Sequence, residues 1–167
     1  TEPLPVPGHD DGGDLLAPTP PVVAAPTKVA VLGDSISVAT GSDGDGQSGG
    51  IAAQRPRNSW STGDYPGLDS QLQRLRVVSP SALGVNLAFN GGRVARDLVP
   101  QVANLPDGIE YVTVQMGGND LCRPTVGEMT PVTVYADRVR EALQILERDH
   151  PEALVSLSSI PDIYRLW

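Results

Sequence analysis

Two short runs of β-branched residues, each followed at once by glycine, place the strongest constraint on how this chain folds. They read "KVAVL" at residues 28–32 and "YVTVQM" at residues 111–116. Such runs are typical of buried strands that end at a turn. Weaker runs at residues 84–89 and 154–159 predict two more strands. We therefore expect a sheet of four strands.

Helical patterns separate these strands. Residues 131–149 predict a long helix, with Thr130 as N-cap, Pro131 at the first helical position and apolar residues at Val134, Val139, Leu143 and Leu146. Shorter helices are expected at about residues 66–76 and 94–104, where Pro100 should kink or shorten the second. Strands that alternate with helices predict an α/β fold in which helices cover both faces of a parallel sheet.

The amino-terminal stretch differs from the rest of the chain. Its first 26 residues contain seven prolines and no periodic apolar pattern, and the chain begins with Thr1 rather than methionine. A segment of this kind cannot bury enough surface to offset its ordering entropy. We interpret residues 1–27 as a flexible leader or linker and residues 28–167 as one domain, and we hypothesise that the protein is secreted.

Composition and charge exclude some classes of partner. Only 4% of the residues are aromatic against 40% hydrophobic overall, so the core must consist mainly of aliphatic side chains. The 20 acidic and 12 scattered basic residues give a net charge of −8, which argues against nucleic acid as a partner. No apolar run approaches the ~20 residues needed to cross a bilayer, so no membrane insertion is predicted. Nothing in the sequence indicates an oligomeric state.

A glycine-rich and acidic loop at residues 41–50 invites comparison with calcium loops. Asp43 and Asp45 have the spacing of the first two ligands of such a loop. However, Gln47 occupies the next ligand position, Ser48 replaces the template's glycine, and Gln54 replaces its final glutamate. We interpret the segment as a surface loop and predict no metal site.

Three kinds of group follow three consecutive predicted strands. Ser35 offers a hydroxyl nucleophile, Gly91 permits close approach of a backbone N–H, and Asn119 carries an amide donor. Acyl transfer needs a nucleophile and hydrogen-bond donors aimed at the oxyanion of its tetrahedral intermediate. Each residue taken singly is also an ordinary turn or capping residue. Ligands bind beyond the carboxyl ends of strands in such sheets, so the joint placement favours a site.

The same segments resemble a known family. "GDS" at residues 33–35, "NLAFNGG" at 86–92 and "GGND" at 117–120 resemble, in order and spacing, the first three sequence blocks of the SGNH (GDSL) hydrolases. "NSWSTG" at 58–63 and "SIPDIYRLW" at 159–167 resemble the secreted actinobacterial branch. The resemblance extends over nearly all of residues 28–167.

This resemblance implies a three-layer, flavodoxin-like fold and hydrolysis of acyl esters, including lipid esters, through an acyl-serine. It makes Ser35 the nucleophile and assigns the oxyanion hole to the Ser35 and Gly91 N–H groups and the Asn119 side chain. Asp34 would hold the nucleophile loop in shape, supported by Gly33 and Gly117. No metal or organic cofactor is implied.

The chain departs from the family in its histidines. The family's base lies in a late Asp-x-x-His block, whereas this chain has only His9, in the proline-rich start, and His150, after the long helix. We expect His150 to lie at the opposite end of the sheet from Ser35, and the chain to lack a last strand, a last helix and the base. The single cysteine, Cys122, is either free or has lost its partner.

Two other functions remain open. A non-catalytic binding module would keep the fold without the base. A nucleotide-binding flavodoxin-like domain is weaker, because neither common glycine-rich phosphate-binding motif follows the first strand.

Overall fold

A parallel sheet forms the centre of the molecule. The computed structural model describes residues 24–42 and 52–160. Its strands are β1 (Lys28–Gly33), β2 (Leu83–Asn86), β3 (Tyr111–Gln115) and β4 (Leu154–Leu157), in the order β2-β1-β3-β4. All neighbouring pairs are parallel, with Val29 opposite Tyr111 in the central pair. The α/β fold and its four strands are thus confirmed.

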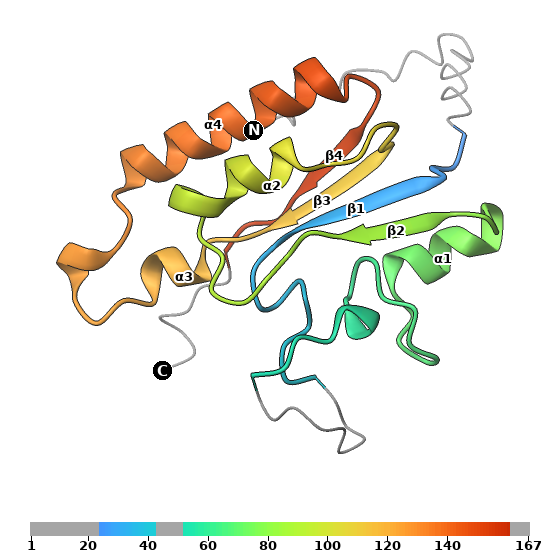
Figure 1. The fold of residues 1–167 in the computed structure, drawn as a ribbon, viewed down its shortest axis with the longest axis horizontal. Helices are drawn as coiled ribbons and strands as arrows, with labels where there is room; N and C mark the ends of the chain where they lie inside the picture. The colour runs from blue at the N-terminus through green and yellow to red at the C-terminus, as the bar shows by residue number, and fades with distance from the viewer. Residues whose placement is uncertain (1–23, 43–51, 161–167) are drawn as a thin grey trace, which may run out of the picture.

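Helices lie on both faces of this sheet (Figure 1). One face carries α1 (Gln71–Val78), and the other carries the π-helix η2 (Val94–Leu98), α2 (Val99–Ala103) and the long α4 (Val132–Asp149). The remaining short elements are η1 (Pro56–Asn58), α3 (Gly118–Leu121) and η3 (Val126–Glu128).

The core lies mainly between the sheet and the layer of α2 and α4. Its larger cluster joins apolar side chains of β1, β3, η2, α2 and α4, and a smaller cluster packs Val29 against Leu72 and Ala82 under α1. Strand β1 is central, and residues 29–32 are completely buried. In the described part of the chain, no helix has the length and apolar character needed to span a bilayer.

Helix α1 begins later than the sequence predicted. The expected range was about residues 66–76, but the helix starts at Gln71. The Ser70 side chain accepts a hydrogen bond from the Gln73 N–H, and the Gln73 side chain accepts one from the Ser70 N–H. This reciprocal capping box fixes the first turn at Ser70.

The prediction that Thr130 caps α4 is wrong. Pro131 holds the N-cap position, and no side chain caps the helix there. The Thr130 hydroxyl instead donates to Asp120 Oδ1 at 2.7 Å. The Thr130 hydroxyl therefore bonds to Asp120 in another element instead of capping α4.

Pro100 shapes the helix after β2, as predicted. Proline has no N–H to donate to the fourth residue before it. The segment is divided into the π-helix η2 and the short α-helix α2, whose first turn contains Pro100.

Candidate active site

The predicted strand-end segments meet where the direction of winding of the sheet reverses. The chain leaves β1 for β2 on one side and returns to β3 on the other, so the carboxyl ends of β1 and β3 flank the switch point. Ligands of parallel α/β sheets bind in the crevice at this place. Ser35 follows β1 by two residues, and Gly117 follows β3 by two.

Of the two serines after β1, only Ser35 is partly exposed. Ser37 is fully buried, and its hydroxyl donates to the Gln115 carbonyl at 3.3 Å. Ser35 lies at the start of a helical turn, in which the Val38 N–H donates to the Asp34 carbonyl and the Thr40 N–H to the Ser35 carbonyl. Of these two serines, Ser35 is therefore the one accessible to solvent.

Asp34 ties the turn after β1 to the turn after β3. The side chain is 3% exposed, and its Oδ1 accepts from the Ile36 N–H at 3.0 Å. Burial raises the pKa of Asp34, with a smaller upward contribution from the charge of Asp120, although hydrogen bonds from the Ile36 and Gly117 N–H groups oppose the rise. These bonds lie within the turn after β1 and between this turn and the turn after β3.

Two adjacent glycines after β2 have different surroundings. The Gly92 N–H donates to the Phe89 carbonyl, closing a turn in which Gly91 has a φ of 73°. Gly91 is exposed and has open space around its Cα, so only its backbone conformation demands glycine. Gly92 is buried, and a Cβ there would lie 3.0 Å from the Gly33 carbonyl oxygen. Gly92 thus brings the β1 and β2 ends together.

Asn119 reaches the same turn from β3. It lies in α3, and its Nδ2 donates to the Gly92 carbonyl at 3.0 Å. A carboxamide has two N–H groups, so this bond orients the side chain while using one of them. Gly117, the N-cap of α3, has a φ of 138°, and a Cβ on it would collide with the Ile160 side chain.

Asp120 is a structural residue of this site that the sequence did not reveal as such. It is 1% exposed, and its carboxylate accepts from Val94 N at 2.8 Å, Ala95 N at 3.2 Å and the Thr130 hydroxyl. It therefore holds the start of η2 against the β3 turn. The only sequence signal is its position next to Asn119.

Two more residues form hydrogen bonds between distant segments that the sequence did not predict. Gln101 of α2 is 4% exposed, and its carboxamide bonds to both the N–H and the carbonyl of Gly33. The Tyr135 hydroxyl of α4 donates to the Met116 carbonyl at 3.1 Å, and burial raises the pKa of Tyr135. A polar glutamine within the apolar run "LVPQVANL" was the available signal for Gln101.

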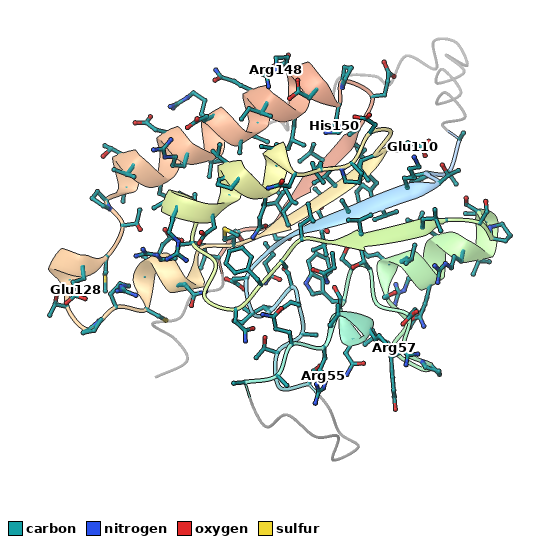
Figure 2. The ribbon with its side chains drawn as sticks, viewed as in Figure 1. Arg55, Arg57, Glu110, Glu128, Arg148 and His150 are labelled. Carbon is teal, nitrogen blue, oxygen red and sulfur yellow. The ribbon has the colours of Figure 1, made fainter. Side chains whose placement is uncertain are left out.

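The histidine of the described residues lies away from this site. His150 follows α4 and stands at the end of the sheet where β4 begins, the same end as Glu110 before β3 (Figure 2). Ser35 lies beyond the opposite end of the sheet, because it follows the carboxyl end of β1, which is parallel to β3 and β4. His9 and the loop residues Asp43, Asp45, Gln47 and Ser48 lie outside the described residues.

Neither a metal site nor a disulfide occurs in the parts of the chain described here. No group of three or more His, Cys, Asp or Glu side chains is placed to hold a metal ion within residues 24–42 and 52–160. Cys122 is exposed and free.

Comparisons with known proteins agree with this arrangement. A family model for GDSL-like lipases/acylhydrolases matches residues 29–166. The membrane-associated phospholipase B1 of Homo sapiens is 29% identical over 165 residues, a match that covers 83% of this chain and 11% of that protein.

Solved esterases share the fold. The esterase EstA of Pseudoalteromonas sp. superposes with a TM-score of 0.52 at 18% identity, and a carbohydrate esterase family 2 enzyme of Corynascus thermopiles with 0.54 at 21%. A family two carbohydrate esterase of Cellvibrio japonicus gives 0.55 at 16%. Each match covers 83% of this chain but only 63%, 46% and 43% of those chains, respectively. The chain thus spans less than two thirds of each of these relatives.

Proposed function

Because the chain belongs to the GDSL-like lipase/acylhydrolase family, we propose that it forms the nucleophile and oxyanion half of a serine ester hydrolase. The observation that carries the proposal is the convergence of three strand-end segments at the switch point of the sheet. Ser35 is the nucleophile, with oxyanion donors from the Ser35 N–H, the Gly91 N–H and the Asn119 amide.

The chemistry follows from these groups. The Ser35 oxygen attacks the carbonyl carbon of an ester while its proton passes to a base, and the carbonyl oxygen gains negative charge. N–H donors stabilise this charge in the tetrahedral intermediate. The intermediate collapses to an acyl-serine and an alcohol, and water then releases the acid by the same steps.

The base is proposed to come from sequence beyond these 167 residues. The family resemblance implies a histidine in an Asp-x-x-His block, and His150 stands at the far end of the sheet from Ser35. Removing a base from a serine triad typically reduces kcat by several powers of ten, while oxyanion donors and binding retain some catalysis. We therefore expect slow acylation by the 167-residue chain and full turnover only in a longer one.

Acylation with p-nitrophenyl acetate tests the nucleophile. The chain should release nitrophenol with a burst, and the peptide that contains Ser35 should gain one acetyl group by mass spectrometry. Ser35→Ala should abolish both signals, whereas Ser81→Ala, at an exposed turn before β2, should change neither. Equal bursts from Ser35→Ala and the parent would refute the assignment.

The oxyanion role of Asn119 has its own test. Removing one oxyanion donor typically costs about 10²- to 10³-fold in rate. Asn119→Ala should slow Ser35 acylation by a factor in this range while the four-strand fold persists by circular dichroism. An acylation rate within twofold of the parent would remove Asn119 from the proposed oxyanion hole.

A non-catalytic binding module is the second candidate. It is favoured by the position of His150 and by the sequence, which has only one other histidine, His9. Reading the coding sequence past Trp167 distinguishes the two. An Asp-x-x-His block there supports the hydrolase, and its absence together with no acetylation of Ser35 supports the binding module.

Substrate and location complete the proposal. We propose small acyl-ester or lipid substrates, in line with the family, and export of the protein, as the proline-rich start suggests. Cell fractionation with the native upstream sequence tests the export.

A further inference from the structure

Gly33, the last residue of β1, lies beyond the point where β2 ends beside β1. The β1–β2 pairing runs from Lys28 opposite Leu83 to Val31 opposite Asn86, and the Leu87 N–H still donates to the Val31 carbonyl at 3.0 Å. Backbone groups of a strand face the same neighbour at every second residue. The next residue of β1 that faces β2 is therefore Gly33, but β2 has already ended.

The Gln101 side chain occupies the place of the missing strand. Its Oε1 accepts from the Gly33 N–H at 2.7 Å, and its Nε2 donates to the Gly33 carbonyl at 2.8 Å. A carboxamide presents one acceptor and one donor side by side, as a strand peptide does. Gly33 and Gln101 are both buried, so neither bond is readily replaced by water.

Because the Gln101 side chain takes the place of a strand, the crevice beside Gly33 stays open. Because a side chain completes the hydrogen bonding of β1, the chain after β2 is free to turn away and form the loop at Gly91 and Gly92. That loop packs on the same peptide, since a Cβ on Gly92 would lie 3.0 Å from the Gly33 oxygen. Gln101 thus holds the group on which two of the three site segments meet.

We propose that Gln101 is a positioning residue for Ser35, whose carboxamide replaces a strand at Gly33 and fixes the turn that carries the nucleophile. The two hydrogen bonds join Gln101 to Gly33, which lies 68 positions earlier in the sequence. Ser35 follows Gly33 by two residues. The consequence for catalysis rests on the proposed function, but the effect on the turn does not.

The main experiment uses Gln101→Leu, which keeps most of the buried volume and removes both bonds. The matched control is Gln144→Leu, an exposed position on α4. In 15N-labelled chains, amide exchange at Gly33 should accelerate about tenfold or more in Gln101→Leu relative to the amides of β3, as expected for loss of a buried acceptor. The 15N order parameter of Ser35 should fall, while the control should show neither change.

A second variant separates positioning from simple loss of packing. Gln101→Glu has the shape of glutamine, and its protonated carboxyl can accept from the Gly33 N–H and donate to the Gly33 carbonyl. Its carboxylate form instead places a second acceptor against that carbonyl. Gly33 protection should therefore recover in Gln101→Glu as the pH falls, whereas the ratio of Gln101→Leu to the parent should not depend on pH.

Acylation of Ser35 by p-nitrophenyl acetate is measured in parallel. A displaced nucleophile should acylate about 10- to 100-fold more slowly in Gln101→Leu. If the parent is never acylated, the proposed function fails, and Gly33 exchange and Ser35 order still decide on the positioning role. That role is overturned if Gly33 exchange changes less than about twofold, if it rises only in step with the β3 amides, or if Ser35 order is unchanged.

Discussion

Replacing Asp120 with alanine should destabilise the fold more than an average substitution. The carboxylate is almost completely buried and accepts three hydrogen bonds, from the N–H groups of Val94 and Ala95 and from the Thr130 hydroxyl. Hydrogen bonds to charged groups contribute about 1.5–3 kcal/mol each, and the two orphaned N–H groups lie at a helix start with little access to water. Partial relaxation reduces the sum, so we expect a loss of about 3–5 kcal/mol, at the upper end for single substitutions.

Two milder variants show where this energy resides. Thr130→Val removes one of the three bonds at a half-buried site and should cost about 1 kcal/mol. Asp120→Asn should cost about 2–3 kcal/mol, because either orientation of the amide turns its NH2 group toward a backbone N–H. The Asp120→Ala/Thr130→Val double variant should cost less than the sum of its parts, since the Thr130 bond is lost only once.

Urea denaturation measures these values. With a slope of about 2 kcal/mol/M for a protein of this size, Asp120→Ala should lower the midpoint by about 2 M. A loss of 1 kcal/mol or less, or strict additivity with Thr130→Val, would refute the idea that Asp120 holds η2 to the β3 turn. A changed slope would point instead to an altered unfolded or native state.

Three further predictions concern Asp34, the glycines and the cap of α1. Burial raises the folded-state pKa of Asp34, so the folded form binds the extra proton and stability falls as pH rises between the ordinary carboxyl pKa and the raised one. Asp34→Asn should therefore gain stability relative to the parent across that window, and a pH-independent difference in urea midpoint would contradict this. Gly33→Ala should cost about 3 kcal/mol or more, because its Cβ would lie 2.6 Å from the Gln115 carbonyl oxygen. Gly91→Ala should cost only about 1 kcal/mol from its positive φ, so equal melting temperatures for the two would be evidence against this packing. Ser70→Ala should cost about 1–2 kcal/mol through loss of the capping box and of the bond to the Gly63 carbonyl, whereas Ser81→Ala should be neutral in the same thermal scan.

The strands, and the meeting of the segments that follow them, were predictable from sequence because strands depend on local patterns. A β-branched run followed by glycine identifies β1 and β3, and a parallel sheet gathers their carboxyl ends at one edge. The apolar residues around Gln101 mark it as unusual, but nothing local identifies its partner Gly33, which lies 68 residues away. Thr130 was misassigned for a similar reason. A threonine before Pro131 and an apolar helical pattern favours an N-cap, but its hydroxyl donates to the carboxylate of Asp120, ten residues earlier in the chain.

The start of α1 was the weakest part of the helix prediction. The expected start at residue 66 precedes a turn with positive φ at Gly67 and Asp69, and the helix begins only after Ser70 closes its capping box. Apolar periodicity indicates that a helix forms, but the end of a helix depends on single hydrogen bonds.

The central position of β1 also determines when the site forms during folding. Its partners β2 and β3 come from distant parts of the sequence, with Val29 opposite Tyr111, and the bonds to Gly33 from Gln101 close another long loop. Helix α4 depends on local contacts and forms quickly, whereas contacts between distant segments are slow. In a refolding experiment the helical signal should thus recover before Ser35, the proposed nucleophile, becomes reactive toward an activated ester, so this reactivity should report the last step in assembling the sheet.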